Sequence, residues 1–223
     1  MRGRVQPRPV ADIAEAAARV FMAKGYRAAG ISDVAAALKL SHGAVYTYAK
    51  SKEALLYLAL LRLLRPDSLD ALDIPVASPA PEEIVALIDS WATGQNALPT
   101  VIGDRPGEFG AVVDELYEFV ERNWRLLALI ERCAADLPEL AQFYFVERRR
   151  TLLAALADHL RAGIQRGVLR PVPDVPAAAR FITETVTWFA WHRNGDPDSA
   201  MLDDEVCRST VRHLLLAAFV ESS

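Results

Sequence analysis

A short segment in the first quarter of the chain gathers side chains that form hydrogen bonds and ion pairs. His42, Tyr46 and Thr47 carry imidazole and hydroxyl groups, and Lys50 and Lys52 follow within a few residues. Such groups can bond the edges of nucleic-acid bases, and ammonium groups can pair with phosphates. The same residues also allow a plainer interpretation, in which Tyr46 packs in a core and the lysines form a solvated face.

Charge is distributed unevenly along the 223 residues. Residues 1–65 contain 11 Lys and Arg against 4 Asp and Glu, whereas residues 66–223 contain 14 against 25. A locally basic segment attracts a polyanion even when the whole chain carries a net charge of −4. Three arginines near the start, Arg2, Arg4 and Arg8, could follow a groove or a phosphate backbone. Charge alone leaves RNA and a membrane surface open as partners.

Helices must position these side chains, because apolar residues recur at three- and four-residue steps and no alternating strand pattern is found. We expect a first helix that ends at Gly25, a second over residues 31–38, and a third that begins after the N-cap Ser41 and ends near Tyr48. Only three residues separate the second helix from the third. So short a connection predicts a helix-turn-helix, which places its second helix in the major groove of DNA.

The third expected helix has one face suited to packing and one suited to recognition. Val45 and Ala49, four residues apart, should point back onto the first two helices. The opposite face then presents His42, Tyr46, Thr47 and Tyr48, and the small Gly43 allows a close approach to the bases. Lys50 and Lys52 are placed to reach phosphates.

The rest of the chain also reads as helical. A fourth helix begins after Ser51 and is apolar nearly all round, which predicts burial. A proline-containing loop over residues 66–81 should join a small N-terminal unit to a larger one. Further helices are expected at about residues 82–97, 108–122, 124–135, 138–166, 174–193 and 203–220. The fold class is therefore all-α, with residues 1–50 and 51–223 as the two expected domains.

Several other classes of function lack support in the sequence. The four histidines have no metal-ligand spacing, there is no CxxC pattern, and no glycine-rich phosphate loop occurs, so we expect no enzyme, no metal and no cofactor. No run approaches the roughly 18 apolar residues of a membrane span. Cys133 and Cys207 give no disulfide framework, and we expect them to be packed thiols in a reducing, cytoplasmic protein.

The run FMAKGYRAAGISDVAAALKLSHGAVYTYAKSKEALL resembles the N-terminal DNA-binding domain of the TetR family of bacterial transcriptional repressors, over about residues 10–60. The matching features are Phe21, Lys24-Gly25-Tyr26, Asp33-Val34-Ala35, Ser41-x-Gly43-Ala44-Val45-Tyr46 and Ser51-Lys52-Glu53-Ala54-Leu55-Leu56. The resemblance implies that eight positions lie at the DNA interface. They are Ser32, Ser41, His42, Gly43, Tyr46, Thr47, Tyr48 and Lys52.

Three positions depart from the family pattern. Lys39 stands where a turn glycine is most common, so we expect it to adopt a left-handed conformation at a cost of roughly 1–2 kcal/mol. Ala49 replaces a usual aromatic residue, and Lys50 replaces a usual proline. The smaller Ala49 leaves space that Tyr48 or Tyr57 could fill, and a Tyr48 turned inward would be lost as a phosphate contact.

The resemblance also implies a role for the acidic C-terminal part. We expect a homodimer through helices at about residues 138–166 and 174–193, with a small-molecule pocket in each subunit. The candidate ligand-binding residues are Trp91, Tyr117, Trp124, Glu184, Trp188 and His192. These features together predict a ligand-responsive regulator, a repressor that binds a palindromic or near-palindromic operator in double-stranded DNA and is released by a small apolar or amphipathic effector.

One alternative stays open. The chain could be a dimeric ligand-sensing or protein-interaction module that does not bind DNA. The positive excess and the polar recognition face of the N-terminal segment favour DNA binding, because a segment that had lost this role should lose both features. Activation uses the same DNA contacts as repression, and the sequence does not separate the two.

Overall fold

The computed structural model describes residues 9–94 and 109–221, which form two compact units. The first unit comprises Met1–Gln95 and Arg125–Tyr144, and the second comprises Asn96–Trp124 and Phe145–Ser223. The described residues are helical throughout, apart from turns and two isolated β-bridges. This confirms the predicted all-α class. None of the described helices is long and apolar enough to cross a bilayer.

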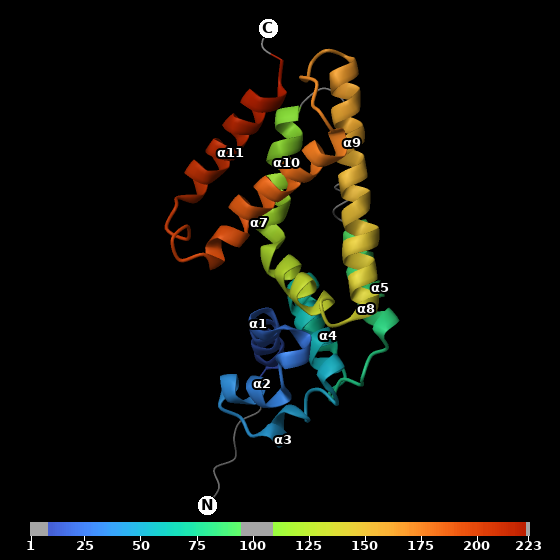
Figure 1. Cartoon of the computed structure of the whole chain (residues 1–223). Helices are drawn as coiled ribbons and strands as arrows, with labels where there is room; N and C mark the ends of the chain where they lie inside the picture. Colours follow the sequence, from blue (N-terminus) through green and yellow to red (C-terminus); the bar gives the residue numbers. More distant parts are fainter. Residues whose placement is uncertain (1–8, 95–108, 222–223) are drawn as a thin grey trace, which may run out of the picture. The chain divides into compact units, whose positions relative to one another are not determined.

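Two helices, α1 and α4, form the core of the first unit (Figure 1). The helix α1 spans Val10–Ala28 and α4 spans Lys52–Leu64. Gly25 interrupts α1 with φ 79°, so the predicted stop at this glycine is confirmed. The side chains of Phe21 and Leu58 are almost completely buried, because the apolar stripe of α1 packs against the apolar surface of α4.

The second and third helices form the expected helix-turn-helix. The helix α2 spans Ile31–Leu38 and α3 spans His42–Val45. Lys39 ends α2 with φ 55° and ψ 38°, which confirms the left-handed conformation predicted for it. The expectation that the third helix continues to Tyr48 is wrong, because residues 46–48 form a turn instead.

The first unit also contains elements that the sequence did not predict. The segment expected to be a loop over residues 66–81 begins with a 3-10 helix, η1, at Pro66–Ala71. Val76 then pairs with Ala49 in an isolated parallel bridge. The helix α5, Pro81–Gly94, confirms the helix expected at about residues 82–97 as far as the described residues reach, and the short α8, Pro138–Ala141, packs against it.

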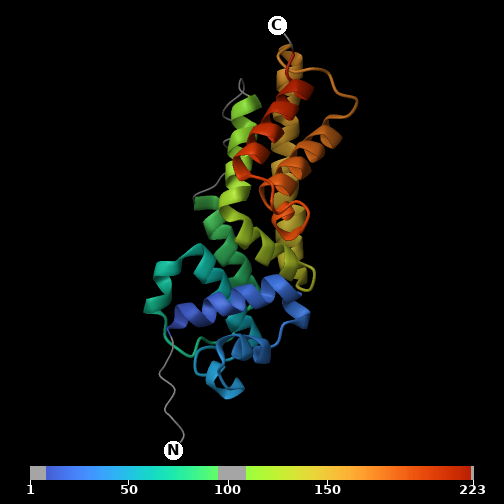
Figure 2. The ribbon, with the colours of Figure 1, turned by 90° about the vertical axis from the view of Figure 1, so that its left-hand side faces the viewer.

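The second unit is a group of longer helices. The helix α7 spans Phe109–Ala134 and contributes its first part to this unit and its last part to the first unit. The remaining elements are α9 at Arg149–Gln165, α10 at Val175–Ala190, a 3-10 turn η3 at His192–Gly195, and α11 at Asp204–Phe219. The helix α10 packs against both α9 and α11, as Figures 1 and 2 show from two sides.

Two predicted boundaries in the C-terminal part are corrected. The helices expected at about 108–122 and 124–135 are one helix, α7, in which the Asn123 amide donates to the carbonyl of Phe119 at 2.8 Å and so stays within the helical turn. The helix expected at 138–166 consists of α8, a π-helical segment η2 at Gln142–Arg148, and α9. The boundary between domains at residue 50 remains a prediction.

Replacing Lys39 by glycine should stabilise the protein. A left-handed backbone costs a non-glycine residue roughly 1–2 kcal/mol, and part of that gain is offset by the greater freedom of glycine in the unfolded chain. We expect Lys39→Gly to raise the free energy of unfolding in urea by up to about 1 kcal/mol. The exposed Ala37 inside α2 is the control, since Ala37→Gly should lower it by about 1 kcal/mol. A Lys39→Gly protein no more stable than the parent would show that the backbone there is not strained.

Candidate nucleic-acid interface

The short helix α3 is held in place by its ends and by one buried side chain. The hydroxyl of Ser41 accepts a hydrogen bond from the backbone N–H of Ala44 at 3.2 Å, which caps the first turn. Val45 is fully buried, and the next helix, α4, begins with the hydroxyl of Ser51 accepting from the N–H of Ala54 at 3.1 Å. The sequence predicted both caps and the inward position of Val45. The backbone of α3 is therefore fixed on both sides.

Most of the residues predicted to contact DNA lie exposed on or beside α3. Tyr46 is 42% exposed, and its ring meets that of His42 edge to face at a centroid distance of 5.3 Å. The Thr47 hydroxyl is exposed and donates to the carbonyl of Ala44 at 2.7 Å, which fixes its orientation. A Cβ atom added to Gly43 would meet nothing within 4 Å, so this surface is open to an approaching partner. The exposed members of the predicted set are Ser32, Ser41, His42, Gly43, Tyr46 and Thr47.

Tyr48 must be removed from the predicted contact set. Its side chain is only 6% exposed and lies in the core of the unit. Ala49 beside it is also buried, so Tyr48 is turned inward, which was one of the two expected possibilities. The carbonyl of Tyr48 accepts a hydrogen bond from the N–H of Val76 at 2.8 Å. The residue therefore supports the interface from behind.

Lys52 is half-buried and has a structural role. Its ammonium group donates to the carbonyl of Arg27 at 3.1 Å and lies 4.6 Å from the centre of the Tyr26 ring. These contacts join the start of α4 to the end of α1. Two other lysines, Lys39 and Lys50, flank α3 and are exposed. Sequence reasoning treated Lys39 only as a turn residue and so missed it as a cation beside the recognition surface.

A partly buried hydrogen bond reinforces the same junction. The Tyr26 hydroxyl donates to Oε1 of Glu53 at 2.5 Å. This bond is the main cause that lowers the pKa of the Glu53 carboxyl below its usual range. Burial, followed by the Glu53 contact, raises the pKa of the Tyr26 hydroxyl. The tyrosine therefore stays neutral and the carboxylate stays charged, which keeps a negative group beside Lys52.

The start of α2 is also fixed by a carboxylate. Oδ2 of Asp33 accepts from the backbone N–H of Gly30 at 2.8 Å, and its Oδ1 lies 2.7 Å from Nζ of Lys24. The Lys24 contact, followed by the Gly30 bond, lowers the pKa of Asp33. The Gly30 bond caps the start of α2 and the Lys24 contact connects α2 to α1, so the helix before the turn has a defined position.

A part of the interface support lies far from α3 in the sequence. The backbone N–H of Lys50 donates to the carbonyl of Val76 at 2.9 Å, and the hydroxyls of Ser51 and Ser78 lie 2.8 Å apart. These bonds bind the segment after η1 to the turn that follows α3. The prolines of this segment predicted a loop but carried no signal for where it would pack.

Two acidic residues, Glu15 and Asp136, connect α1 to other parts of the first unit. Glu15 on α1 forms ion pairs with Arg62 of α4, at 3.4 Å, and with Arg125 of α7. Asp136, just after α7, accepts from the backbone N–H of Arg27 at 2.7 Å. The contacts with Arg125 and Asp136 therefore hold α1 against residues that lie more than 100 positions later in the chain.

The candidate ligand-binding residues have contacts of several different kinds. The hydroxyl of Tyr117 donates to the carbonyl of Phe189 at 3.3 Å inside the second unit, and Glu184 pairs with two arginines of α9 and α10. Trp124 and His192 share an open hollow of about 480 Å³, together with residues of the turn after α10. Trp188 packs edge to face on the neighbouring Phe189, and Trp91 lies on α5 of the other unit. Their role in ligand binding remains a prediction.

The remaining predictions concern the two cysteines, groups of potential metal ligands and the basic N-terminal arm. Cys133 and Cys207 are free and buried, as expected, and burial raises the pKa of the Cys133 thiol to about 12. Among the described residues no group of three or more His, Cys, Asp or Glu is arranged to hold a metal ion. The predicted basic arm with Arg2, Arg4 and Arg8 lies outside the described residues.

Two helices joined by a tight left-handed turn, with polar side chains on the exposed face of the second, define a helix-turn-helix protein. Residues 13–57 match the family described as bacterial regulatory proteins, tetR family. This match assigns the N-terminal segment to the DNA-binding domain of that family of regulatory proteins.

Full-length comparisons agree with this assignment. The chain is 26% identical to the HTH-type transcriptional repressor KstR2 of Mycolicibacterium smegmatis over 194 residues, which cover 85% of this chain and 82% of that protein. KstR2 of Mycobacterium tuberculosis is 28% identical over 192 residues, covering 85% and 84%.

Solved structures show the same fold. The ketosteroid transcriptional regulator KstR2 of Mycobacterium tuberculosis matches with a TM-score of 0.57 and 21% identity, over 99% of this chain and 98% of that one. The TetR family transcriptional regulator PfmR from Thermus thermophilus matches with a TM-score of 0.51 and 28% identity, over 92% and 97%.

Removing the Tyr26 hydroxyl should weaken the unit in a pH-dependent way. The lowered pKa of Glu53 stabilises the fold above the usual carboxyl range, and this contribution is lost as the pH falls through the lowered value. We expect Tyr26→Phe to reduce the free energy of unfolding by about 1 kcal/mol near pH 7, because the charge-assisted bond is partly screened by solvent. The loss should shrink near pH 4, as urea titrations at both pH values would show. Tyr57→Phe, a matched loss of one hydroxyl on α4, should give no such difference. Equal losses from Tyr26→Phe at both pH values would contradict the assigned coupling.

Proposed function

We propose that this regulator is a repressor that binds a palindromic or near-palindromic operator as a homodimer and is released by a small apolar or amphipathic effector. The observation that carries the proposal is the exposed polar face of α3 on a fixed scaffold. The repressor role is supported by the relatives, two of which are named transcriptional repressors. Because its target is bacterial DNA, the protein should act in the cytoplasm.

The side chains around α3 divide into two kinds of DNA contact. His42, Tyr46 and Thr47 are exposed and carry groups that can bond base edges, so they should determine sequence preference. Lys39 and Lys50 flank them as exposed cations and should bind phosphates of any sequence. In this proposal the base-reading groups lie at the centre of the contact and the phosphate-binding groups lie at its edges.

A selection of bound sequences from random double-stranded DNA tests this division. We expect the parent protein to enrich a palindromic or near-palindromic site, and Tyr46→Ala and Thr47→Ala to relax the preference at particular positions, at about 1–3 kcal/mol for each lost contact. Lys50→Ala should weaken binding to all sequences alike and reduce the slope of the salt dependence by about one. Tyr48→Phe is the control, because a buried ring should leave the preference unchanged. No salt-sensitive binding to any duplex would refute the proposed function and favour the module that does not bind DNA.

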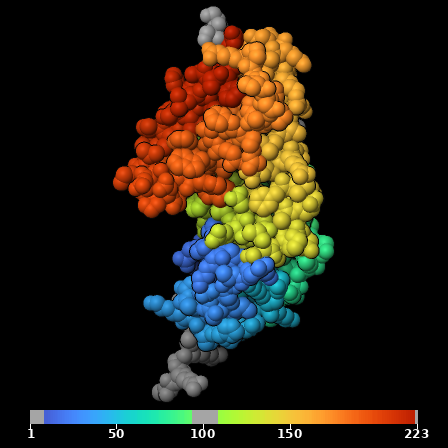
Figure 3. Space-filling model, viewed as in Figure 1, coloured from blue at the N-terminus to red at the C-terminus, as the bar shows by residue number. Residues whose placement is uncertain are grey.

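The proposed dimer needs an exposed apolar surface in the second unit. Phe181 and Trp188 of α10 are 58% and 38% exposed, and Val206 and Leu214 of α11 are 59% and 60% exposed. Within each helix the two residues are about two turns apart and so share one face. Figure 3 shows α10 and α11 as one continuous surface, coloured orange to red. An exposed apolar surface of this kind is typical of an interface.

This distribution changes the pair of helices that we propose for the dimer. The sequence led us to expect the helices at about 138–166 and 174–193. The large apolar residues that are exposed in the described part of the second unit lie on α10 and α11, at Trp124 of α7 and in the loops, and none lies on α9. We therefore propose that α10 is kept as an interface helix and that α11 takes the place of α9.

A charged substitution on α10 should separate the subunits. We expect Phe181→Glu to shift the protein from dimer to monomer at micromolar concentration in analytical ultracentrifugation, because the interface would bury an unpaired carboxylate. Ala154→Glu places the same charge on the exposed face of α9 and should leave the dimer intact. The reverse result, with Ala154→Glu dissociating the protein and Phe181→Glu not, would return the interface to α9.

Effector release requires coupling between the two units. A ligand that binds better to one arrangement of the DNA-binding heads lowers DNA affinity by the same factor by which DNA lowers ligand affinity. One candidate for the transmitting element is the buried helix α4, which begins directly after the turn that follows α3. The structure adds a second candidate, α7, because this helix is continuous from the second unit to the first and carries Arg125, the partner of Glu15 on α1.

A further inference from the structure

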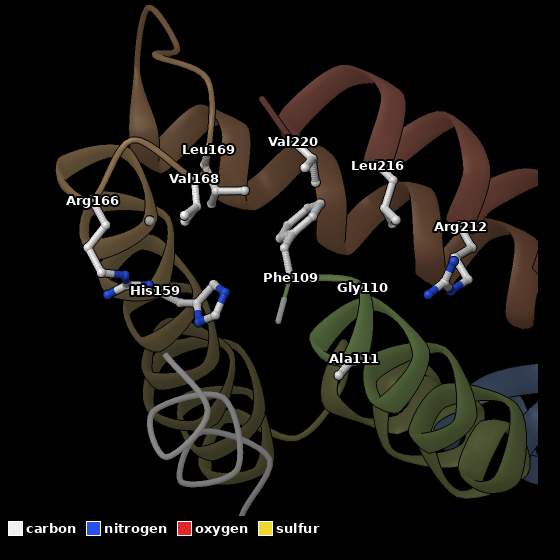
Figure 4. A pocket seen from close by; sticks show the side chains of 11 residues that line it. Phe109, Gly110, Ala111, His159, Arg166, Val168, Leu169, Arg212, Leu216 and Val220 are labelled. Carbon is white, nitrogen blue, oxygen red and sulfur yellow. The ribbon is translucent and has the colours of Figure 1, made fainter. Parts of the chain in front are cut away.

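The second unit contains a cavity that none of the predicted ligand-binding residues lines. Its volume is about 320 Å³, at the lower end of the roughly 300–1,000 Å³ of small-molecule sites. The lining comes from the first turn of α7, the last turns of α9, the connection after α9, and α11, as Figure 4 shows. Sequence reasoning missed it because these segments are far apart in the chain.

The inner wall of the cavity is apolar. Phe109 is 4% exposed and lies between two aromatic rings, with centroid distances of 6.5 Å to His159 and 5.5 Å to Phe219. Leu169 and Leu216 complete this wall. A short hydrocarbon chain placed against these side chains would be removed from water, which is the main source of affinity for an apolar group.

One wall is fixed by close packing. Arg170 donates its backbone N–H to the carbonyl of Phe219 at 2.8 Å, and an antiparallel bridge joins Leu169 to Val220. A Cβ atom added to Gly163 would lie 2.4 Å from Cδ1 of Leu169, so only glycine lets the connection approach α9 this closely. The cavity is therefore bounded by a wall that packing and hydrogen bonds hold in place.

The polar side chains that line the cavity are those of a histidine and two arginines. His159 is 7% exposed on the α9 side, Arg166 is exposed at the rim on the same side, and Arg212 is exposed at the rim on α11 (Figure 4). No aspartate or glutamate is among the residues that line the cavity. Asp114, outside the lining, lies 3.0 Å from Nε of Arg212 and satisfies part of that guanidinium. A rim with two cations and an apolar interior matches a molecule with a negative head and an apolar tail.

The geometry points to this cavity as a binding site for a small anionic amphiphile, with a carboxylate or similar head at Arg166, on the rim beside His159, and the tail against Phe109. The assignment of this amphiphile as the effector rests on the proposed function, whereas its binding to the cavity does not. A neutral molecule of the same shape would gain the apolar contacts but not the charge-assisted hydrogen bonds, so charge should decide the affinity.

Isothermal titration calorimetry with octanoate tests the site, and octanamide serves as the uncharged probe of the same length. We expect octanoate to bind the full-length protein at least about tenfold more tightly than octanamide, a factor that corresponds to about 1.4 kcal/mol. Arg166→Gln should remove most of this difference. Arg161→Gln is the matched control, because Arg161 lies on the same helix and pairs with Asp158, outside the lining.

A second variant keeps the test independent of charge. Ala111 lines the cavity and is only partly buried, so Ala111→Leu should fill the space and weaken octanoate by at least about tenfold while the melting temperature confirms a folded protein. No octanoate binding to the parent, equal binding of both probes, or unchanged octanoate affinity in Arg166→Gln and Ala111→Leu would overturn the proposal. Salt-sensitive DNA binding measured on the same preparations separates this failure from a failure of the proposed function.

Discussion

The recognition surface depends on the tertiary contacts of a helix that is too short to be stable alone. The first turn of a helix costs more conformational freedom than its hydrogen bonds return, and α3 has only four residues. Its conformation is supplied from outside, by the cap at Ser41, the buried Val45 and the pairing of residues 48–50 with Val76. The exposed side chains of His42, Tyr46 and Thr47 can then vary without loss of the backbone that presents them, because none of these supports uses those side chains.

The lysines and arginines of the first unit have two roles: some can attract a polyanion, and others form contacts within the fold. The basic excess of residues 1–65 suits a polyanion, but part of it is used inside the fold. Lys24 pairs with Asp33, and Lys52 bonds the end of α1 beside the Tyr26–Glu53 pair. Lys52 therefore matches a family pattern at a DNA-facing position, yet its ammonium group forms a hydrogen bond that connects α4 to α1. A match to the motif therefore identifies a residue's place in the sequence pattern but does not show which groups its side chain contacts.

Local signals in the sequence predicted much of the fold and of the recognition surface. The caps at Ser41 and Ser51, the stop at Gly25 and the left-handed Lys39 each depend on neighbours within about four residues, so their chemistry is visible in the sequence. The burial of Tyr48 was foreseen only as one of two possibilities. Other features join segments that are distant in the chain, and a single sequence does not indicate which distant segments will meet. They are the pairing of Val76, the ion pair between Glu15 and Arg125, and the cavity beside Phe109.

Two carboxylates connect α1 to α7 and to the residue just after it, on either side of a break in α1. Glu15 holds the first half of α1 to Arg125, and Asp136 holds the backbone of Arg27 near its end. Gly25 lies between these two contacts and interrupts the helix, so α1 is held as two segments. A displacement of α7 near Arg125 should therefore act on the residues before Gly25, whereas a displacement near Asp136 should act on the short segment that leads into α2.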